Sequence, residues 1–395
     1  MKKSKASLSV IFITVFIDLL GFGILIPILP TFASKDLAVS DFGIGLIIAV
    51  FSFVQFLFNP ILGKISDKVG RKPIIVLSLL ITSSSYILFS FSNTFILLLI
   101  SRMLAGLGGS NIGVAQAYIA DVTTKEERSK GMGLIGAAFG LGFVFGPLIG
   151  GLISGFGYEY AGYGSAAFSF MAFLFAIFFL PESNTIRQKD SKISFKLFDI
   201  SEIRSTFKIP QVGLLIMIFF IIIFSIANIY GTFAILGYKV YGFSDRENGY
   251  LFGVMGIVGT IIQGGLIKKL TKRFSDISLV RVGTIFMMLG LGFLPYGDSF
   301  LSAVLIVIVL SVGTGLLQPM ILSMISKYSP DNKQGAILGI TQSFSALGRV
   351  LGPLWGGFAF DYIGYEFPFL TGALFTFITF MITIIVLNKK YMKAY

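Results

Sequence analysis

The chain has no cysteine and no histidine among its 395 residues, and it has a single tryptophan. Without Cys and His there are no disulfides, no catalytic thiol and none of the usual side-chain ligands of zinc. Charged residues are also scarce, at 13% of the chain, whereas soluble domains carry about 25%. A chain with so little charge cannot cover itself with polar surface, so the composition excludes an ordinary soluble domain and favours the lipid bilayer as solvent.

Long hydrophobic runs fill the rest of the sequence. Hydrophobic residues make up 55% of the chain, and the mean hydropathy is +0.89. A membrane helix needs about 20 apolar residues to cross about 30 Å of hydrocarbon. The sequence predicts an all-α membrane protein with twelve spans, at 8–30, 43–62, 73–92, 94–119, 131–155, 161–181, 211–236, 248–267, 278–296, 299–325, 335–360 and 366–388.

The positive charges alternate between the loops. The net charge is +12, and 25 of the 31 Lys and Arg residues lie on one side, in the two terminal segments and every second loop. The opposite loops hold only Lys35, Lys239 and Arg246. Cytoplasmic loops carry such an excess, so we expect both termini in the cytoplasm and the chain in the cytoplasmic (inner) membrane. The basic residues form no contiguous face, so a nucleic-acid partner is not expected.

An internal repeat divides the chain into halves. Residues 141–151 read LGFVFGPLIGG, and 206 positions later residues 347–357 read LGRVLGPLWGG. Such repeats build transporters whose site lies between the halves. We therefore predict two pseudo-symmetric six-helix bundles, 1–181 and 211–395, joined by a cytoplasmic loop at 182–210.

The glycines of the repeat recur every four residues, so they share a helix face and let another helix pack closely. The proline removes a backbone donor and favours a bend. This pattern indicates either plain helix packing or a bent helix that also serves as a rocking gate. The residues assigned to this role are Gly142, Gly146, Pro147, Gly150, Gly151, Gly352 and Pro353.

Four motifs together resemble the major facilitator superfamily. Residues 63–73, GKISDKVGRKP, are similar to its loop signature between helices two and three, and the GPxxGG of the fifth span resembles that of its proton-coupled drug antiporters. Arg102-Met-Leu-Ala-Gly106 resembles its arginine motif, and the segment from Asp18 to Thr31 resembles the first helix of tetracycline efflux proteins. The resemblance implies the major facilitator fold and proton-driven drug efflux by alternating access.

The chain departs from the tetracycline exporters at three places. Those proteins carry an acid just before a tyrosine in helix three, where this chain has Ser85 before Tyr86. They also use a histidine in helix eight and an acid in helix nine, and this chain has neither. We therefore expect small amphipathic organic compounds as substrates and not the magnesium–tetracycline chelate.

Asp18 is the only carboxylate deep inside a predicted span. A charge at mid-bilayer costs at least about 2.5–3.5 kcal/mol, so such residues are usually functional. Arg102, in the fourth span, is expected at a similar depth because the two helices run in opposite directions. Asp18 is predicted to carry the coupling proton beside Arg102. A static ion pair between helices one and four, or a carboxylate that binds substrate, are the alternatives.

Polar side chains elsewhere in the spans are candidates for a substrate cavity. Gln116 lies about 40° from Arg102 around an ideal helix, so both are expected to line one cavity. Asn111 lies on the opposite face and is expected to bond a neighbouring helix. Each candidate has an alternative role in hydrogen bonding between helices. The candidates are Gln55, Asn59, Gln116, Asn228, Gln318, Gln342 and Arg349.

The loop signature predicts a cytoplasmic latch made of Gly63, Asp67, Gly70, Arg71 and Asp121. Asp67 is expected at a helix N-terminus, where the helix dipole favours an anion. The family resemblance implies that Asp67 contacts the other half in one state and that Arg71 pairs with Asp121. The alternative is ordinary solvated loop charge.

The sequence thus predicts a secondary transporter that acts on a small molecule, exchanges protons and functions as a monomer. It has no GxxxxGK[ST] motif, so ATP is not the direct energy source and the proton is the only expected coupling factor. A membrane enzyme is not expected, because one embedded carboxylate supplies no catalytic pair. A channel fits a duplicated chain with a single midplane acid less well. A proton symporter, or an exporter of a lipid, sugar or metabolite, remains open.

Overall fold

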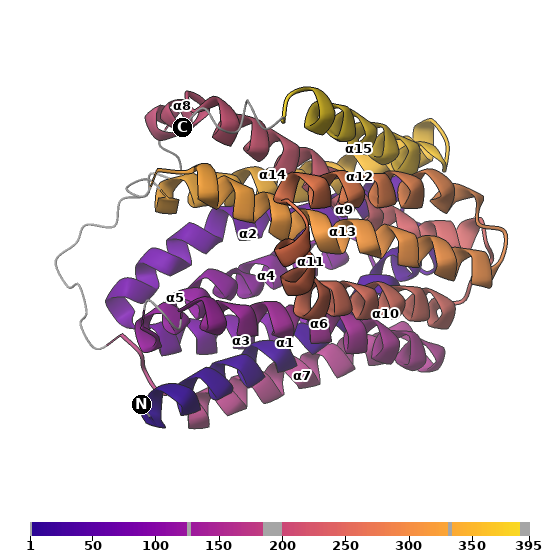
Figure 1. Cartoon of the computed structure of the whole chain (residues 1–395). Coiled ribbons are helices and arrows are strands. Elements are labelled where there is room, and N and C mark those ends of the chain that lie inside the picture. The colour runs from indigo at the N-terminus through magenta and orange to yellow at the C-terminus, as the bar shows by residue number, and fades with distance from the viewer. Residues whose placement is uncertain (1, 125–127, 185–199, 331–333, 388–395) are drawn as a thin grey trace. The chain divides into compact units, whose positions relative to one another are not determined.

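The fold is all-helical over the part of the chain that the structure describes. A computed structural model describes residues 2–124, 128–184, 200–330 and 334–387 (Figure 1). The first repeat contains α1 (Lys2–Lys35), α2 (Asp41–Val69), α3 (Arg71–Ser90), α4 (Phe95–Gly108), η1 (Gly109–Asn111), α5 (Ile112–Val122), α6 (Arg128–Ile153), η2 (Ser154–Phe156) and α7 (Tyr158–Phe179). Then follow α8 (Ile200–Phe207), α9 (Pro210–Lys239), α10 (Asp245–Ile261), η3 (Ile262–Leu266), α11 (Ile267–Arg273), α12 (Asp276–Phe293), η4 (Leu294–Tyr296), α13 (Phe300–Tyr328), α14 (Gln334–Tyr362) and α15 (Phe367–Ile385).

Each of the twelve predicted spans coincides with a helix or with consecutive helical segments. Within the described ranges, eleven helical stretches are long and apolar enough to cross a membrane. The remaining predicted span, 335–360, is α14. The polytopic membrane architecture is therefore confirmed, and the chain is a multi-pass membrane protein.

Two stretches predicted as loops are partly helical. The predicted loop 63–72 continues α2 to Val69, and α3 begins at Arg71. Only Gly70 separates them, with a φ of 116° that side chains other than glycine rarely adopt. The charged residues at 64–72 led to the prediction of a loop, but a helix can become polar where it leaves the membrane and still continue. The predicted loop 182–210 likewise contains α8, and its residues 185–199 lie outside the described part of the chain.

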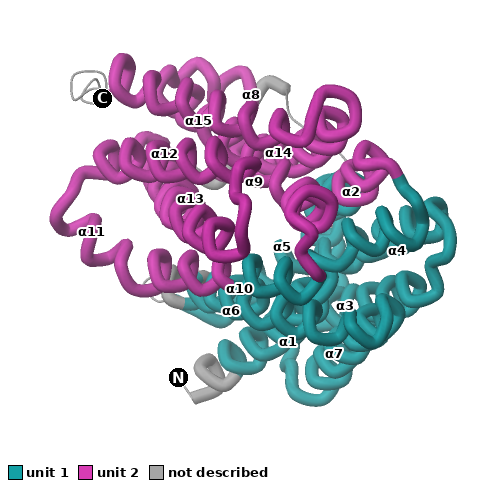
Figure 2. The backbone as a smooth tube through the Cα atoms, turned by 90° about the vertical axis from the view of Figure 1, so that its right-hand side faces the viewer, with its two compact units in different colours: residues 1–39, 50–197, 245–253 teal, residues 40–49, 198–244, 254–395 magenta. Residues whose placement is uncertain are grey.

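The described chain forms two compact units, coloured separately in Figure 2. Unit 1 comprises residues 1–39, 50–197 and 245–253, and in it α1 packs against α6 and α7 while α3 packs against α4 and α7. Unit 2 comprises residues 40–49, 198–244 and 254–395, and in it α9 packs against α14 and α15 while α12 packs against α13 and α15. The division of the sequence at 182–210 stays a prediction.

In unit 1 the glycines of the repeat bring α6 onto α1. A Cβ built on Gly146 would lie 2.5 Å from the Cα of Gly23, and one built on Gly142 would lie 2.8 Å from the Cβ of Leu19. Gly150 approaches the backbone of Ile24 in the same way. No side chain fits between these backbones, so glycine is required on this face.

Unit 2 uses the second copy of the motif in the same manner. A Cβ on Gly352 of α14 would lie 2.6 Å from the carbonyl oxygen of Phe224 in α9, and one on Gly348 would lie 3.1 Å from the backbone nitrogen of Phe224. Gly356 continues this face against Asn228. The sequence repeat is therefore a structural repeat, in which the first and fifth helices of each copy meet through glycine.

We predict that Gly146→Ala lowers the thermal unfolding midpoint of the purified protein in detergent. The added methyl group has no space against Gly23, and overpacking of this kind typically costs about 1–3 kcal/mol. Gly136→Ala, on the same helix, is the matched control because nothing lies within 4 Å of its Cβ position. Equal midpoints for the two variants would contradict this account of the helix contact.

Candidate transport site

Asp18 lies inside unit 1, where only neutral groups bind it. Its side chain belongs to α1 and only 8% of the residue is exposed. The hydroxyl of Ser169 on α7 donates to its Oδ1 at 2.7 Å, and the side chain of Asn111 also hydrogen-bonds to it. The prediction that Asn111 bonds a neighbouring helix is thus confirmed. Asp18 itself as that partner, and the role of Ser169, were not foreseen.

Arg102 lies in the same unit and makes no ion pair with Asp18 in the described structure. The residue is 6% exposed, and its guanidinium carbon lies 4.9 Å from the ring centroid of Phe51 on α2. Its Nε has no hydrogen-bond partner. Tyr86 interacts electrostatically with both Asp18 and Arg102. The geometry therefore gives no support to a static ion pair between helices one and four.

A short 3₁₀ turn, η1, interrupts the fourth span between Arg102 and Gln116. Such a turn advances about 120° per residue instead of about 100°, so three residues add about 60° of rotation. Arg102 is buried and Gln116 is exposed. The added rotation takes the pair from about 40° on one side to about 20° on the other, so η1 does not move them to different faces, and the cavity role of Gln116 stays a prediction.

The middle of α2 packs on this interrupted helix. Gly106 allows the approach, since an added Cβ would lie 2.6 Å from the carbonyl oxygen of Phe51. One turn further along, Nε2 of Gln55 donates to the carbonyl oxygen of Gly109 at 3.0 Å. Oδ1 of Asn59 is buried without a hydrogen-bond partner. Gln55 therefore bonds another helix, and the cavity role of Asn59 stays a prediction.

The other cavity candidates lie in unit 2. Nδ2 of Asn228 donates to the carbonyl oxygen of Pro368 at 2.5 Å, so this residue links α9 to α15. Arg349 is partly buried, and its Nη1 donates to Oγ of Ser345 at 2.7 Å. Gln318 is partly buried on α13, and Gln342 is exposed on α14.

Arg71 is the centre of the latch. Its Nη2 lies 2.6 Å from Oδ1 of Asp67, and its Nε lies 3.1 Å from Oδ2 of Asp121. Its Nη1 donates to Oγ of Ser66 at 2.6 Å. The pairing of Arg71 with Asp121 that the family resemblance implied is present. The role of these residues in gating stays a prediction.

The expected position of Asp67 was wrong. Asp67 lies in the last turn of α2, which ends at Val69, where the helix dipole disfavours an anion. The guanidinium of Arg71, four residues later, offsets this unfavourable position. Gly63 lies inside α2, and a Cβ built on it meets nothing within 4 Å.

Glu182 is a member of the latch that sequence reasoning missed. Its carboxylate accepts from the backbone N–H groups of Arg71 at 2.8 Å and Lys72 at 3.2 Å, and so satisfies the N-terminus of α3. Ser183 donates to Asp121 at 2.9 Å, and Asn184 donates to the carbonyl oxygen of Asp67. In the sequence, the only sign of this role of Glu182 was its position one residue beyond the sixth predicted span.

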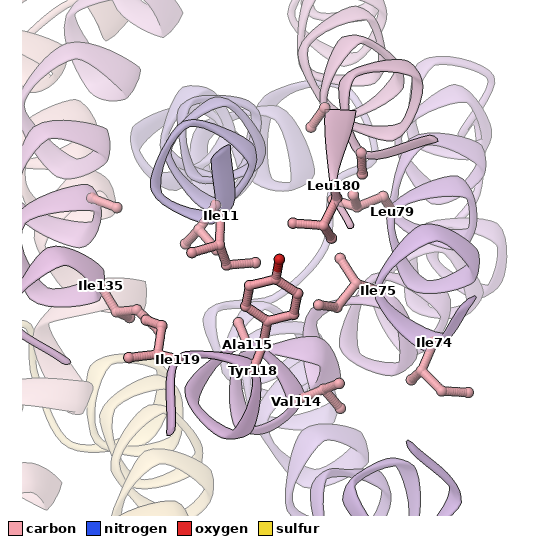
Figure 3. Close-up of a cluster of buried hydrophobic side chains, with 14 of the residues drawn as sticks. Ile11, Ile74, Ile75, Leu79, Val114, Ala115, Tyr118, Ile119, Ile135 and Leu180 are labelled. Carbon is pink, nitrogen blue, oxygen red and sulfur yellow. The ribbon is translucent and has the colours of Figure 1, made fainter. Parts of the chain in front are cut away.

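A cluster of apolar side chains supports the latch from inside unit 1. Figure 3 shows the ring of Tyr118 surrounded by Ile11, Ile75, Ala115 and Leu180. These side chains come from α1, α3, α5 and the residue that follows α7. They therefore connect the ends of four helices. Asp121 follows Tyr118 on α5, and Arg71 precedes Ile75 on α3, so the charged residues of the latch belong to helices that pack in this core.

A duplicated set of membrane helices, with a buried carboxylate and a buried arginine in its first copy, is typical of membrane transporters. The model of the Major Facilitator Superfamily matches residues 11–353, with a second match over 269–394. The chain belongs to the Major Facilitator Superfamily.

Named relatives agree with this assignment. The chain is 32% identical over 381 residues to Multidrug resistance protein 1 of Bacillus subtilis, with 95% of each chain covered. It is 28% identical over 354 residues to Tetracycline resistance protein, class B, of Escherichia coli, covering 88% of this chain and 87% of that protein. The crystal structure of the human organic anion transporter MFSD10 superimposes with a TM-score of 0.70 at 23% identity, over 96% of this chain and 99% of that one.

We predict that Arg71→Ala changes access to the two ends of unit 1. The variant leaves Asp67 and Asp121 without their cation, which costs about 1–2 kcal/mol, between the limits for exposed and buried pairs. Single cysteines replacing Gly63 or Gly155 serve as reporters, because the chain has no native cysteine and both positions have space for a side chain. Maleimide labelling should rise at one position and fall at the other.

Lys68→Ala is the matched control for this experiment, since it removes a positive charge from the same turn of α2. No ion pair of Lys68 is present in the described structure. Unchanged labelling at both reporters in Arg71→Ala, or equal changes in Lys68→Ala, would show that the latch does not bias the conformational equilibrium.

Proposed function

We propose that the protein is a proton-coupled antiporter that exports small amphipathic organic compounds by alternating access. Asp18 carries the proton, and Arg102 tunes its surroundings. The observation that supports this most is the position of Asp18, buried inside the first span with Ser169 and Asn111 as partners and without a bound cation.

The chemistry of that position favours a proton carrier. A carboxylate held by neutral donors can take up a proton without leaving a buried cation unpaired. A carboxylate in a tight ion pair cannot do this, because protonation would strand the partner charge at a high cost. Arg102 lies in the same unit but forms no ion pair with Asp18 in the described ranges. Protonation at Asp18 is therefore compatible with the packing around it.

The relatives support drugs as the cargo. Besides Multidrug resistance protein 1, the Quinolone resistance protein NorA of Staphylococcus aureus is 27% identical over 363 residues. The substrate is a small molecule held largely by apolar contact, with polar side chains such as Asn59 and Arg349 fixing its orientation. Arg349 has no acidic partner in the described ranges, which favours compounds with an acceptor or an acidic group.

We place the protein in the cytoplasmic membrane with both termini inside. The alternation of Lys and Arg between loops supports this orientation. One chain contains both repeats, so we propose that the monomer transports. The proton gradient supplies the energy, because the sequence has no phosphate-binding loop for ATP.

We predict that Asp18→Asn abolishes efflux driven by a pH gradient in proteoliposomes but leaves substrate counterflow intact. Asn retains hydrogen-bonding capacity toward Ser169 and Asn111 but cannot bind and release a proton. Asp298→Asn, the same change at an exposed site, is the control and should transport normally. Gradient-driven accumulation by Asp18→Asn at the wild-type rate would refute the carrier role. Loss of counterflow together with a lower unfolding midpoint would indicate a structural role instead.

We also predict a substrate profile. Expression in a host without its own efflux pumps should protect against several lipophilic drugs and should give no magnesium-dependent resistance to tetracycline. Ser85, which stands where the tetracycline exporters have an acid, donates to the carbonyl oxygen of Thr82 in its own helix and offers no ligand for a metal chelate. Strong resistance to tetracycline alone would overturn this prediction. Protection against no compound would favour a lipid, sugar or metabolite as cargo.

A further inference from the structure

Arg281 is a cation inside a membrane span that the proposed transport cycle does not use. It lies on α12, five residues after the helix begins at Asp276, which places it about 7.5 Å along the helix from that end. The residue is partly buried and forms no ion pair within the described ranges. A charge at this depth needs a polar partner or a path to the membrane surface.

One hydrogen bond accounts for part of the guanidinium. Nη2 of Arg281 donates to the carbonyl oxygen of Thr383 at 2.7 Å. Thr383 lies in the last turn of α15, where carbonyl oxygens lack a donor from their own helix and a nearby cation is favourable. Arg281 thus caps the end of α15. Its Nε is nevertheless buried without a hydrogen-bond partner in the described structure, so the cap does not use the whole group.

The surface beside this contact is apolar and exposed. Within unit 2, α12 packs against both α15 and α11 (Figure 2). Val282, the next residue of α12, is 42% exposed, and Ile384, the next residue of α15, is 45% exposed. Exposed apolar side chains on a membrane span are suited to contact lipid tails, since the bilayer interior is the apolar solvent around them. Arg281 therefore lies where the boundary between α12 and α15 meets a surface of this kind.

A basic segment adjoins the same end of α12. α11 has seven residues, and four of them are exposed cations without an ion pair in the described ranges. Asp276, the acid between α11 and Arg281 in the sequence, is already paired with Lys327 at 2.5 Å. Basic loops are ordinary on the cytoplasmic side of a membrane protein, and the embedded Arg281 is what distinguishes this one. The four cations of α11 are Lys268, Lys269, Lys272 and Arg273.

The first repeat supplies acids for the cation at the start of its own third helix. Arg71 begins α3 and pairs with two acids of the latch, and the carboxylate of Glu182, which follows the sixth helix, binds the same helix end. The second repeat has no counterpart of Glu182, because residues 386–395, which follow α15, contain three lysines and no Asp or Glu. This difference favours an anion for Arg281 that comes from another molecule.

We propose that an anionic phospholipid binds here, with its phosphate on Arg281 and its acyl chains along the boundary between α12 and α15. The cations of α11 surround the headgroup and give a preference for lipids with net negative charge. The planar guanidinium suits this role, since it can give one donor to Thr383 and others to phosphate oxygens. The predicted orientation places this end of α12 in the cytoplasmic leaflet, whose surface is negatively charged. The inference depends on the membrane architecture and not on the drug or the proton.

The test places a fluorescent reporter beside the site. The chain has no native cysteine, so a single cysteine in place of the exposed Val282 can be labelled with a bimane maleimide. The labelled protein is reconstituted into phosphatidylcholine vesicles with a rising fraction of brominated phosphatidylglycerol or, separately, of brominated phosphatidylcholine. Quenching by bromine reports which lipid is in contact with the label. We expect half-maximal quenching at a lower fraction of the anionic lipid.

Leu77 provides a matched reporter. It is 53% exposed on α3 and lies six residues after Arg71, where that helix begins, just as Val282 lies six residues after Asp276. The two positions are expected at the same depth of the same leaflet, but only Val282 adjoins an arginine without an acidic partner in the described ranges. A label on a cysteine at Leu77 should show no preference between the two lipids.

Arg281→Gln should lower the preference of the Val282 reporter for phosphatidylglycerol roughly fivefold, the effect of one cation near an anionic surface. Gln keeps an N–H donor for the carbonyl oxygen of Thr383. Arg281→Lys keeps the positive charge and should keep most of the preference, which separates loss of charge from loss of folding. Lys269→Gln combined with Lys272→Gln should also lower the preference.

Lys68→Gln is the matched control for charge. Lys68 lies on the same predicted side in unit 1, without an ion pair in the described ranges, and its removal should leave the preference unchanged. Equal quenching by both lipids at Val282, the same preference at Leu77, or an equal loss in Lys68→Gln would overturn the proposal. Loss of the preference on adding inorganic phosphate at constant ionic strength would also overturn it, in favour of a soluble anion. None of these measurements needs substrate or a pH gradient, so their outcome is separate from that of the proposed drug–proton exchange.

Discussion

The contact between the first and fifth helix of each repeat sets the rest of the structure. Lipid tails are as apolar as leucine, so burial gives little drive for helices to associate within a bilayer, and close packing must supply it. Glycine on α6 and α14 lets two backbones approach until no side chain fits between them. Asp18 precedes Leu19, which lies against Gly142, so the same contact fixes the depth and direction of the buried carboxylate.

The charged groups then divide by location. Charges at the helix ends are neutralised by direct ion pairs. Arg71 pairs with Asp67 and Asp121, and Nζ of Lys239 donates to both carboxylate oxygens of Asp41. In the interior of unit 1, Asp18 receives hydrogen bonds from neutral side chains, and Arg102 stacks on an aromatic ring. A direct ion pair at a partly exposed helix end holds two helices together but contributes little free energy, so it can form in one state and break in another. Neutral partners leave a carboxyl free to change its protonation.

Some of this arrangement could be predicted and some could not. The pairing of Arg71 with Asp121 followed from the resemblance of residues 63–73 to the loop signature of the family. The position of Asp67 did not follow, because the helix continues past the membrane boundary that hydropathy marks. Glu182 could not be assigned, since its partners are backbone N–H groups at the start of α3, and backbone groups leave no signature in side-chain identity.

The sequence by itself determined the membrane-spanning helices, their number and their duplication, because the bilayer demands about 20 apolar residues for every crossing and each crossing is specified by its own residues. Tertiary structure alone decided the neutral partners of Asp18 and the pairing of Lys239 with Asp41. Asp41 and Lys239 stand 198 positions apart in the chain. Which side chains meet over such a separation depends on the relative rotation and height of packed helices, and no local pattern of residues encodes these.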